Sequence, residues 1–212
     1  MITNESLFLA FLATSLVLAV TPGPGVVYIV ARTAAQGRPA GLASVAGVAL
    51  GNLCNALAAS LGLAALFAAS ATAFTIVRLA GAAYLVYLGI RMLRPLDPAA
   101  QAPALGAPAL SRIFRDGFAV ALLNPKTALF FAALLPQFID PSGSAALQGA
   151  LLAAVFVGIA LLTDTAYVLA AGVVRQRLGD GAATRRFGRH AAAATLVGLG
   201  VFAALSGSRA TR

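Results

Sequence analysis

Charged residues are scarce in this chain. Of its 212 residues, 10% are charged and 60% are hydrophobic, whereas roughly one-quarter of the residues of a soluble domain are charged. This composition excludes a water-soluble protein and predicts an integral membrane protein.

Cysteine and histidine occur only once each, as Cys54 and His190. A single cysteine excludes an intrachain disulfide, a CxxC redox motif and a thiolate metal site. A His/Asp metal cluster also lacks the necessary residues, so we expect no metal and no cofactor. Because no nucleophile and base stand together in a catalytic pattern, we do not expect an enzyme.

Long apolar stretches dominate what is present. Crossing a hydrocarbon core of about 30 Å takes roughly 20 apolar residues in a helix. The sequence therefore predicts an all-α integral membrane protein with six transmembrane helices. These cover residues 7–31, 42–67, 71–93, 117–138, 146–174 and 191–205. We expect the first stretch to be retained, because residues 1–6 lack the basic charge of a signal peptide.

The basic residues gather in alternate connections between these stretches. Eleven arginines fall there, whereas the opposite connections, 68–70 and 139–145, contain no basic residue. The positive-inside rule then places both termini on the periplasmic side of a bacterial inner membrane. The net charge of +9 thus reports orientation, and we do not expect nucleic acid as a partner. The eleven are Arg32, Arg38, Arg91, Arg94, Arg112, Arg115, Arg175, Arg177, Arg185, Arg186 and Arg189.

A proline-rich connection divides the chain into two similar halves. Residues 94–111 contain four prolines and suit an extended cytoplasmic linker. The halves, 1–93 and 112–212, hold three segments each, and an odd number makes homologous halves insert in opposite orientations. "RLAGAAYLVYLG" from Arg78 and "RHAAAATLVGLG" from Arg189 agree at eight of twelve positions. The sequence therefore predicts two inverted three-helix repeats.

Prolines interrupt the first and fourth segments at corresponding places, "LAVTPGP" and "ALLNPKT". A proline lacks an amide hydrogen and deprives the carbonyl four residues earlier of its helical donor. In a membrane such a break is tolerated where it faces protein or a water-filled cavity. Paired breaks of this kind point to a transporter's binding site. These carbonyls belong to Leu18, Val20 and Ala121, which lie four residues before Pro22, Pro24 and Pro125, respectively.

The chemistry of the breaks suits a zwitterion. The first amides of the new half-helix, those of Gly25, Val26 and Val27, favour a carboxylate, and the freed carbonyls favour an ammonium group. The alternative is that the prolines only kink the helices for packing. The expected substrate-binding residues are Thr21, Pro22, Gly23, Pro24, Gly25, Asn124, Pro125 and Lys126.

Ionisable residues inside the apolar stretches are further candidates, because a charge at mid-membrane costs roughly 2.5–3.5 kcal/mol. Asp164 is the only carboxylate in those stretches, and we expect it to carry a coupling proton or to pair with Lys126. Lys126 is expected to bind a carboxylate or to neutralise Asp164. Snorkelling to an interface is the alternative for Lys126 and for Arg78. Arg78, Asn55 and Tyr84 are secondary site candidates.

Small residues predict close helix contacts. Gly37 with Gly41, and Gly47 with Gly51, have the GxxxG spacing that lets helices approach closely. The pattern predicts a tightly packed bundle or a homodimer.

Three stretches carry a resemblance to a known family: "TPGPGVVYIVARTAAQGRPAGLASVAGVALG", "RLAGAAYLVYLGIRML" and "FRDGFAVALLNPKTALFFAALLPQFI". In order and spacing they resemble the LysE/RhtB family of bacterial amino-acid exporters. The resemblance implies a proton-driven inner-membrane carrier of amino acids such as lysine, homoserine or threonine. It also implies functional roles for Thr21–Pro24 and Asn124–Lys126. This chain departs from the family at Gly25, where asparagine is frequent, and at Arg78, where lysine is frequent.

The sequence thus predicts a secondary transporter that exports neutral or basic amino acids by alternating access, with protons as the coupling ion. The alternative is a non-transporting membrane scaffold that uses its small-residue faces. A membrane-embedded redox carrier lacks its cysteine pair.

Overall fold

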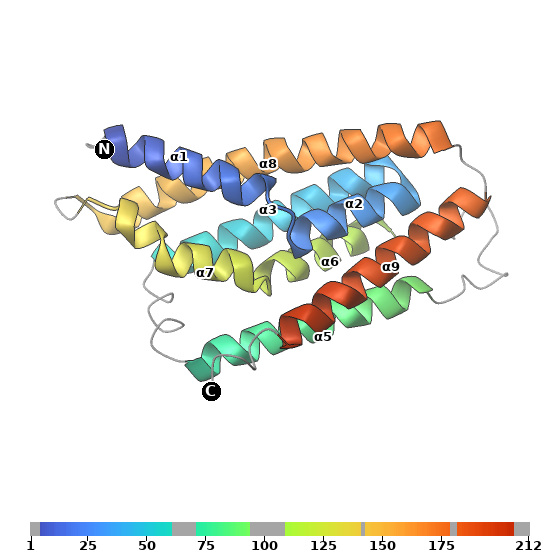
Figure 1. The fold of residues 1–212 in the computed structure, drawn as a ribbon. Coiled ribbons are helices and arrows are strands. Elements are labelled where there is room, and N and C mark those ends of the chain that lie inside the picture. Colours follow the sequence, from blue (N-terminus) through green and yellow to red (C-terminus); the bar gives the residue numbers. More distant parts are fainter. Residues whose placement is uncertain (1–4, 61–70, 94–108, 141–142, 179–181, 206–212) are drawn as a thin grey trace.

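The computed structural model describes residues 5–60, 71–93, 109–140, 143–178 and 182–205, and within them every regular element is a helix (Figure 1). The first half contains α1 (Glu5–Val20), α2 (Pro24–Gln36), α3 (Arg38–Ser60) and α5 (Ala71–Leu93). The second half contains α6 (Leu110–Leu122), α7 (Pro125–Ala133), the 3₁₀ helix η2 (Leu135–Phe138), α8 (Ala145–Leu178) and α9 (Ala182–Leu205).

Four of these helices, α3, α5, α8 and α9, are long and apolar enough to cross a membrane on their own. Two bent pairs raise the candidate spans to six, if each pair is one span. The helices α1 and α2 meet at 46°, and Leu110–Leu122 meets Pro125–Phe138 at 53°. The expected all-α membrane fold, with its first and fourth segments broken, is confirmed.

Several helices start earlier than the apolar stretches indicated. The helices α3, α6 and α9 begin at Arg38, Leu110 and Ala182, ahead of the expected starts at residues 42, 117 and 191. Hydropathy detects the part of a helix that suits lipid, whereas backbone hydrogen bonding continues through its polar first turns. The expected end of the second segment at residue 67 and residues 94–108 of the linker lie outside the described residues.

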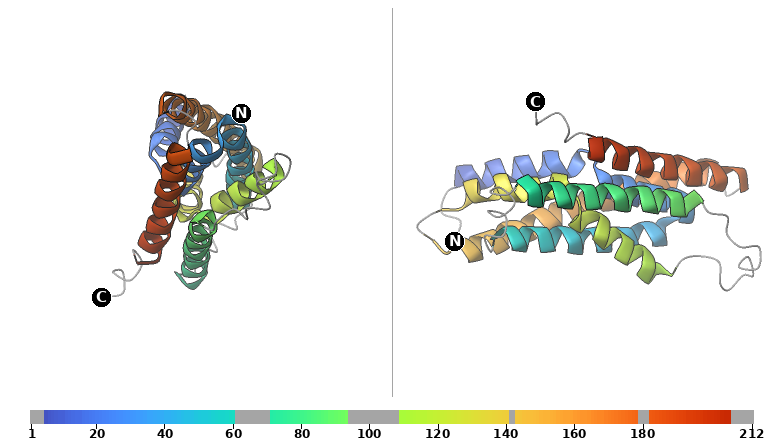
Figure 2. Two further views of the ribbon diagram at one scale, coloured as in Figure 1. Left: turned by 90° about the vertical axis from the view of Figure 1, so that its right-hand side faces the viewer. Right: turned by 90° about the horizontal axis from the view of Figure 1, so that it is seen from below.

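The helices lie roughly along one axis (Figures 1 and 2). The helix α3 packs against α6 and α8, α5 packs along α9, and α2 contacts α3, α8 and α9. Two of these pairs, α3 with α8 and α5 with α9, join elements at the same place in each half. Such pairing is what an inverted repeat requires, and the repeat itself stays a prediction.

Two glycines allow α3 to lie directly against α6. A Cβ atom at Gly47 would collide with the carbonyl of Phe114, and one at Gly51 would lie 2.6 Å from the carbonyl oxygen of Phe118. The tight packing expected from this GxxxG spacing is therefore found within one chain. The homodimer stays a prediction.

The helix ends that flank the arginine-rich connections lie together at one end of the bundle, which we call the basic end. There α2, α5 and α8 finish and α3, α6 and α9 begin, at the right of Figure 1. Arg32 was expected in a connection at this end. It lies instead within α2 with only 3% of its surface exposed, because α2 continues to Gln36 and a buried carboxylate accompanies the charge.

Candidate functional site

A small cavity lies between the two helix breaks. Its volume is about 40 Å³, room for about three water molecules at roughly 10–15 Å³ each. Its lining comes from the two breaks and from α1, α2, α3, α7 and α8. The polar side chains in that lining belong to Thr21, Asn52, Asn124, Lys126, Thr127 and Asp164.

The structure brings six of the expected site residues together around this cavity: Thr21, Gly23, Gly25, Asn124, Lys126 and Asp164. The three prolines form the breaks but are not part of the lining. The secondary candidates Asn55, Arg78 and Tyr84 do not line it either.

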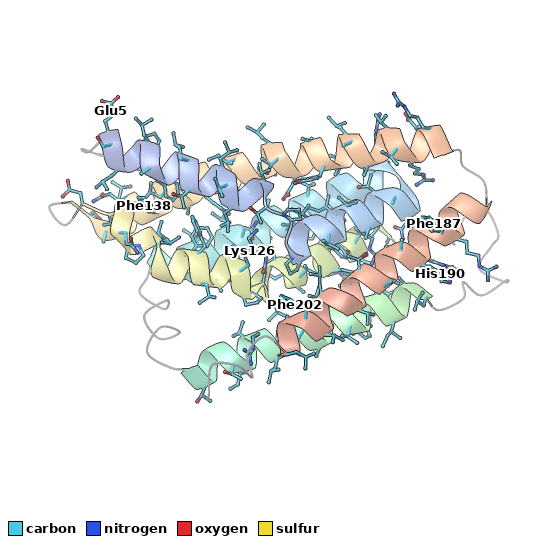
Figure 3. The ribbon with its side chains drawn as sticks, viewed as in Figure 1. Glu5, Lys126, Phe138, Phe187, His190 and Phe202 are labelled. Atoms are coloured by element: carbon cyan, nitrogen blue, oxygen red, sulfur yellow. The ribbon has the colours of Figure 1, made fainter. Side chains whose placement is uncertain are left out.

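Lys126 joins the two breaks to each other. Its ammonium group donates hydrogen bonds to the carbonyl oxygens of Leu18, at 3.0 Å, and Thr21, at 2.6 Å. Figure 3 shows Lys126 near the middle of the bundle, beside the end of α1. The first carbonyl that the prolines set free thus receives its donor from the opposite half of the chain.

The other two freed carbonyls also have side-chain donors from distant helices. The hydroxyl of Tyr167, on α8, donates to the carbonyl of Val20 at 2.7 Å. The side-chain amide of Asn55, on α3, donates to the carbonyl of Ala121 at 2.9 Å. Each break is therefore held by the protein itself, and these carbonyls are not vacant acceptors for an ammonium ligand.

The two half-helices that follow the breaks begin differently. Asn124 caps α7, because its side-chain oxygen accepts from the amide of Lys126 at 3.1 Å and its NH₂ donates to the hydroxyl of Thr127 at 3.0 Å. Asparagine followed by proline is a strong helix start. The N-cap residue of α2 is Gly23, which has no side chain to cap the helix.

The uncapped start of α2 leaves backbone donors at the cavity. The amide of Val27 already donates to the carbonyl of Gly23 at 3.0 Å, so this amide is not free as the sequence suggested. The amides of Gly25 and Val26 precede this first helical bond. Gly25 and Val26 both line the cavity, where the positive end of the helix dipole favours an anion.

Asp164 is buried in α8, with 5% of its surface exposed, and lines the same cavity. Its charge interacts with that of Lys126. The ion pair considered from the sequence is not formed, because the ammonium group of Lys126 is bound to the carbonyls of Leu18 and Thr21. Among the described residues Asp164 has no hydrogen-bond partner. Its carboxylate therefore lies at the cavity without a direct contact to a donor or a positive charge.

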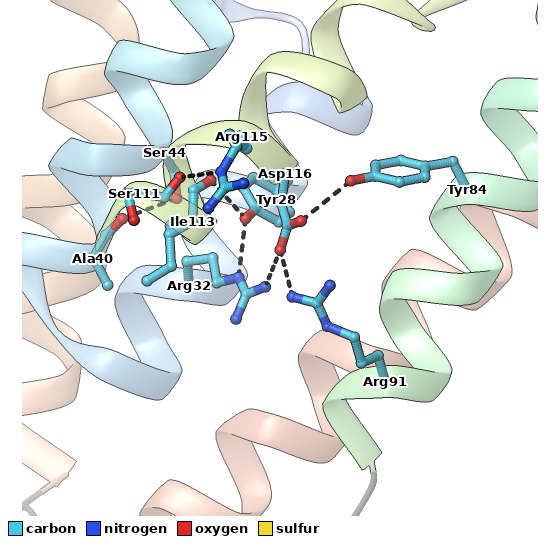
Figure 4. Close-up of polar contacts among 10 residues, drawn as sticks. All are labelled: Tyr28, Arg32, Ala40, Ser44, Tyr84, Arg91, Ser111, Ile113, Arg115 and Asp116. Atoms are coloured by element: carbon cyan, nitrogen blue, oxygen red, sulfur yellow. Dashed lines mark hydrogen bonds and ion pairs between the residues drawn. The ribbon is translucent and has the colours of Figure 1, made fainter. Parts of the chain in front are cut away.

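A second buried carboxylate, Asp116 on α6, lies nearer the basic end. It accepts from the guanidinium groups of Arg32 at 3.1 Å and Arg91 at 2.6 Å, and from the hydroxyl of Tyr84 at 3.2 Å (Figure 4). Tyr28 extends the cluster by accepting from Arg32 and donating to the backbone of α6. We call these five side chains the Asp116 cluster. It ties α2, α5 and α6 together.

Sequence reasoning missed Asp116. An apolar stretch that begins at residue 117 excludes Asp116 and leaves Asp164 as the only carboxylate of the predicted spans. The helix α6 in fact begins at Leu110, and Asp116 is 5% exposed. The sequence signal that would have found it is the pairing of one acidic residue in "FRDG" with two arginines inside neighbouring helices, since a buried charge needs a counter-charge.

Aromatic side chains fill the bundle on the other side of the cavity. The rings of Phe11 and Phe138 pack edge to face with centroids 5.3 Å apart, and those of Phe131 and Phe156 do so at 4.9 Å. Phe130 packs against the same group. Phe156 also lines the cavity. Along the helix axis the cavity therefore lies between this aromatic cluster and the Asp116 cluster.

Comparison with known proteins agrees with this architecture. Residues 16–207 match the family described as LysE type translocators. The chain belongs to this family. The matched residues include both helix breaks, the Asp116 cluster and the aromatic cluster except for Phe11, which lies in the first turns of α1. No solved structure matches the chain at a significant level.

Several relatives of the chain are named as amino-acid efflux proteins. A homoserine/homoserine lactone efflux protein of Salmonella typhimurium is 34% identical over 163 residues, 74% of this chain and 77% of the relative. A leucine efflux protein of Klebsiella pneumoniae is 32% identical over 135 residues, 63% of each chain. An uncharacterized membrane protein of Vibrio cholerae is 36% identical over 135 residues, 64% of this chain and 66% of the relative.

Proposed function

We propose that this protein exports amino acids, neutral or basic, across the bacterial cytoplasmic membrane by proton-coupled alternating access. The observation that carries the proposal is the polar cavity between two broken helices, with Lys126 and Asp164 in its lining. The efflux names of the relatives at 34% and 32% identity support it. Membership of a translocator family also fits a protein that is not an enzyme.

The position of the cavity supports alternating access. A volume of about 40 Å³ is too small for an amino acid, so substrate entry requires the surrounding helices to move. Towards the basic end the Asp116 cluster joins three helices, and towards the other end aromatic rings fill the space. In the proposed cycle one of these clusters separates while the other stays closed.

Asp164 is the proposed proton carrier. A carboxylate without a hydrogen-bond partner in a membrane interior can gain and lose a proton as its surroundings change. One proton moved across the membrane is worth about 2.3 kcal/mol per 100 mV, and about 1.4 kcal/mol corresponds to a tenfold gradient. A single titrating group therefore suffices for a roughly fiftyfold concentration of substrate.

Efflux from proteoliposomes tests this function. The vesicles are loaded with radiolabelled L-homoserine, L-leucine or L-lysine, and efflux is measured with and without a pH gradient. We expect saturable efflux of at least one amino acid, accelerated by inward-directed protons. We expect Asp164→Asn to abolish the response to the gradient. Exchange of internal for external substrate should continue, but should need higher substrate concentrations.

Matched controls separate the outcomes. Glu5→Gln neutralises an exposed carboxylate at the start of α1 and should leave efflux as in the wild type. Lys126→Met, which removes the donor of Leu18 and Thr21, should lower both efflux and exchange. Wild-type vesicles that release none of the three amino acids would support the scaffold alternative, and unsaturable leakage would indicate a channel.

Orientation is part of the proposal. The basic end is expected in the cytoplasm and both termini in the periplasm. Fusing alkaline phosphatase, which is active only in the periplasm, to residue 212 should give an active enzyme. The same fusion within residues 94–108 should be inactive, and the reverse result would contradict the assigned orientation.

A further inference from the structure

The polar side chains around the cavity fall into two groups. Those of Thr21, Asn124, Lys126 and Thr127 are hydrogen-bonded to other protein groups. Those of Asn52 and Asp164 have no hydrogen bond to any described residue. Among the described residues that line the cavity, four of the six polar side chains are therefore hydrogen-bonded within the protein, and two are not.

Asn52 is the more unusual of the two. It lies on α3 with 7% of its surface exposed, and its side-chain oxygen is fully buried without a partner. Leaving a buried acceptor unpaired costs about 1–3 kcal/mol, and buried polar atoms in folded proteins are nearly always satisfied. An unsatisfied amide that lines a cavity is explained if a ligand supplies the missing donor.

The position of Asn52 relative to α2 indicates which part of a ligand it meets. Val48 lies one helical turn before Asn52, and a Cβ atom at Gly25 would lie 3.3 Å from the Val48 side chain. Residues four apart on a helix have side chains about 5–6 Å from each other. Asn52 therefore lies about one turn of α3 away from the amides that favour a carboxylate.

The two groups that are not hydrogen-bonded also share one chemical property. The carboxylate of Asp164 and the amide oxygen of Asn52 both accept hydrogen bonds, and the carbonyls freed by the prolines are already occupied. An ammonium group supplies three donors and a positive charge. In an α-amino acid that ammonium group is attached to the carbon next to the carboxylate, which matches the short separation between α2 and Asn52.

We propose that Asn52 is a substrate-binding residue which, together with Asp164, accepts hydrogen bonds from the α-ammonium group, while the start of α2 holds the carboxylate. This inference rests on the proposed function and deepens it. The site then distinguishes an amino acid from the 2-hydroxy acid of the same carbon skeleton. A hydrogen bond to a charged group contributes about 1.5–3 kcal/mol, so the preference for the amino acid should be about 10- to 100-fold.

The test is competition in proteoliposomes. Exchange is measured with a labelled amino acid that the wild type carries, L-leucine or L-homoserine. Two unlabelled competitors are added separately: L-leucine, and L-2-hydroxyisocaproate, which is the 2-hydroxy acid with the same carbon skeleton. We expect the wild type to prefer L-leucine at least tenfold. Asn52→Ala should weaken inhibition by L-leucine about tenfold or more and leave inhibition by the hydroxy acid nearly unchanged, so that the preference shrinks. Asn52→Asp keeps an acceptor oxygen and should keep the preference.

Asn55→Ala is the matched control. This asparagine lies three residues further along α3, but its amide is bound to the carbonyl of Ala121, so its loss should lower thermal stability without changing the preference ratio. An Asn52→Ala protein that retains the wild-type ratio would overturn the assignment of Asn52 while leaving the export function intact. A wild type that exchanges no amino acid would instead overturn the proposed function.

Discussion

At the scale of single residues, the helix breaks depend on long side chains that reach across the bundle. Tyr167 lies 147 positions from its acceptor Val20, and Lys126 lies 108 positions from Leu18. In lipid an unsatisfied backbone carbonyl costs several kcal/mol. Each of these donors therefore stabilises a break that the local sequence alone could not maintain.

Removing the hydroxyl of Tyr167 isolates one such contribution. Tyr167→Phe keeps the ring and leaves the Val20 carbonyl without its donor, so the free energy of unfolding should fall by about 1–3 kcal/mol. Denaturant unfolding in detergent micelles measures it. Thr14→Val is the control, because the Thr14 hydroxyl only returns to Ala10 on its own helix and its loss should change stability by less than about 0.5 kcal/mol.

At the scale of helices, the position of each break follows from the sequence, whereas its partners do not. Pro22, Pro24 and Pro125 act locally, since a missing amide hydrogen affects a carbonyl four residues away on the same helix. The donors Asn55 and Tyr167 come from elsewhere in the fold, and nothing near them in sequence indicates which carbonyl each one reaches. Asp116 was not predicted for another reason. Its ion pairs allow a charged residue to be buried in a helix that continues beyond the apolar stretch, and hydropathy does not detect this.

Helix contact through glycine gives a second prediction. Gly47→Ala places a methyl group against the backbone of Phe114, which cannot move without separating α3 from α6. We expect a loss of about 1–3 kcal/mol in the free energy of unfolding from overpacking.

Gly158→Ala is the matched control for this substitution. No atom lies within 4 Å of a Cβ atom at Gly158, and alanine is the better helix former by about 0.5–1 kcal/mol. This variant should be as stable as the wild type or slightly more so. Equal behaviour of the two variants would contradict the close α3–α6 contact.

At the scale of the whole molecule, the Asp116 cluster connects the two halves of the chain. The helices α2 and α5 belong to the first half and α6 to the second. The carboxylate of Asp116 on α6 accepts from Arg32 of α2 and from Arg91 and Tyr84 of α5. Removing one member of a buried ion pair leaves an uncompensated charge, which is strongly destabilising. The cluster thus stabilises the arrangement of the halves at the basic end.

Asp116→Asn measures that contribution. The substitution keeps the shape of the side chain but leaves the guanidinium groups of Arg32 and Arg91 without their counter-charge. The free energy of unfolding should fall by about 3–5 kcal/mol, read from denaturant unfolding in micelles. A decrease below about 1 kcal/mol would show that the ion pairs do not hold the halves together.

The contact between Lys126 and the last turn of α1 has a consequence for the proposed transport cycle. The ammonium group at the tip of this side chain is chemically the same kind of group as the one on an amino acid, and it already occupies two main-chain oxygens beside the cavity. In the proposed transport cycle, these two oxygens therefore stay bound to the Lys126 ammonium group while the protein carries no amino acid. An arriving amino acid is then directed away from the broken backbone and towards the proposed acceptors, the carboxylate of Asp164 and the side-chain amide of Asn52.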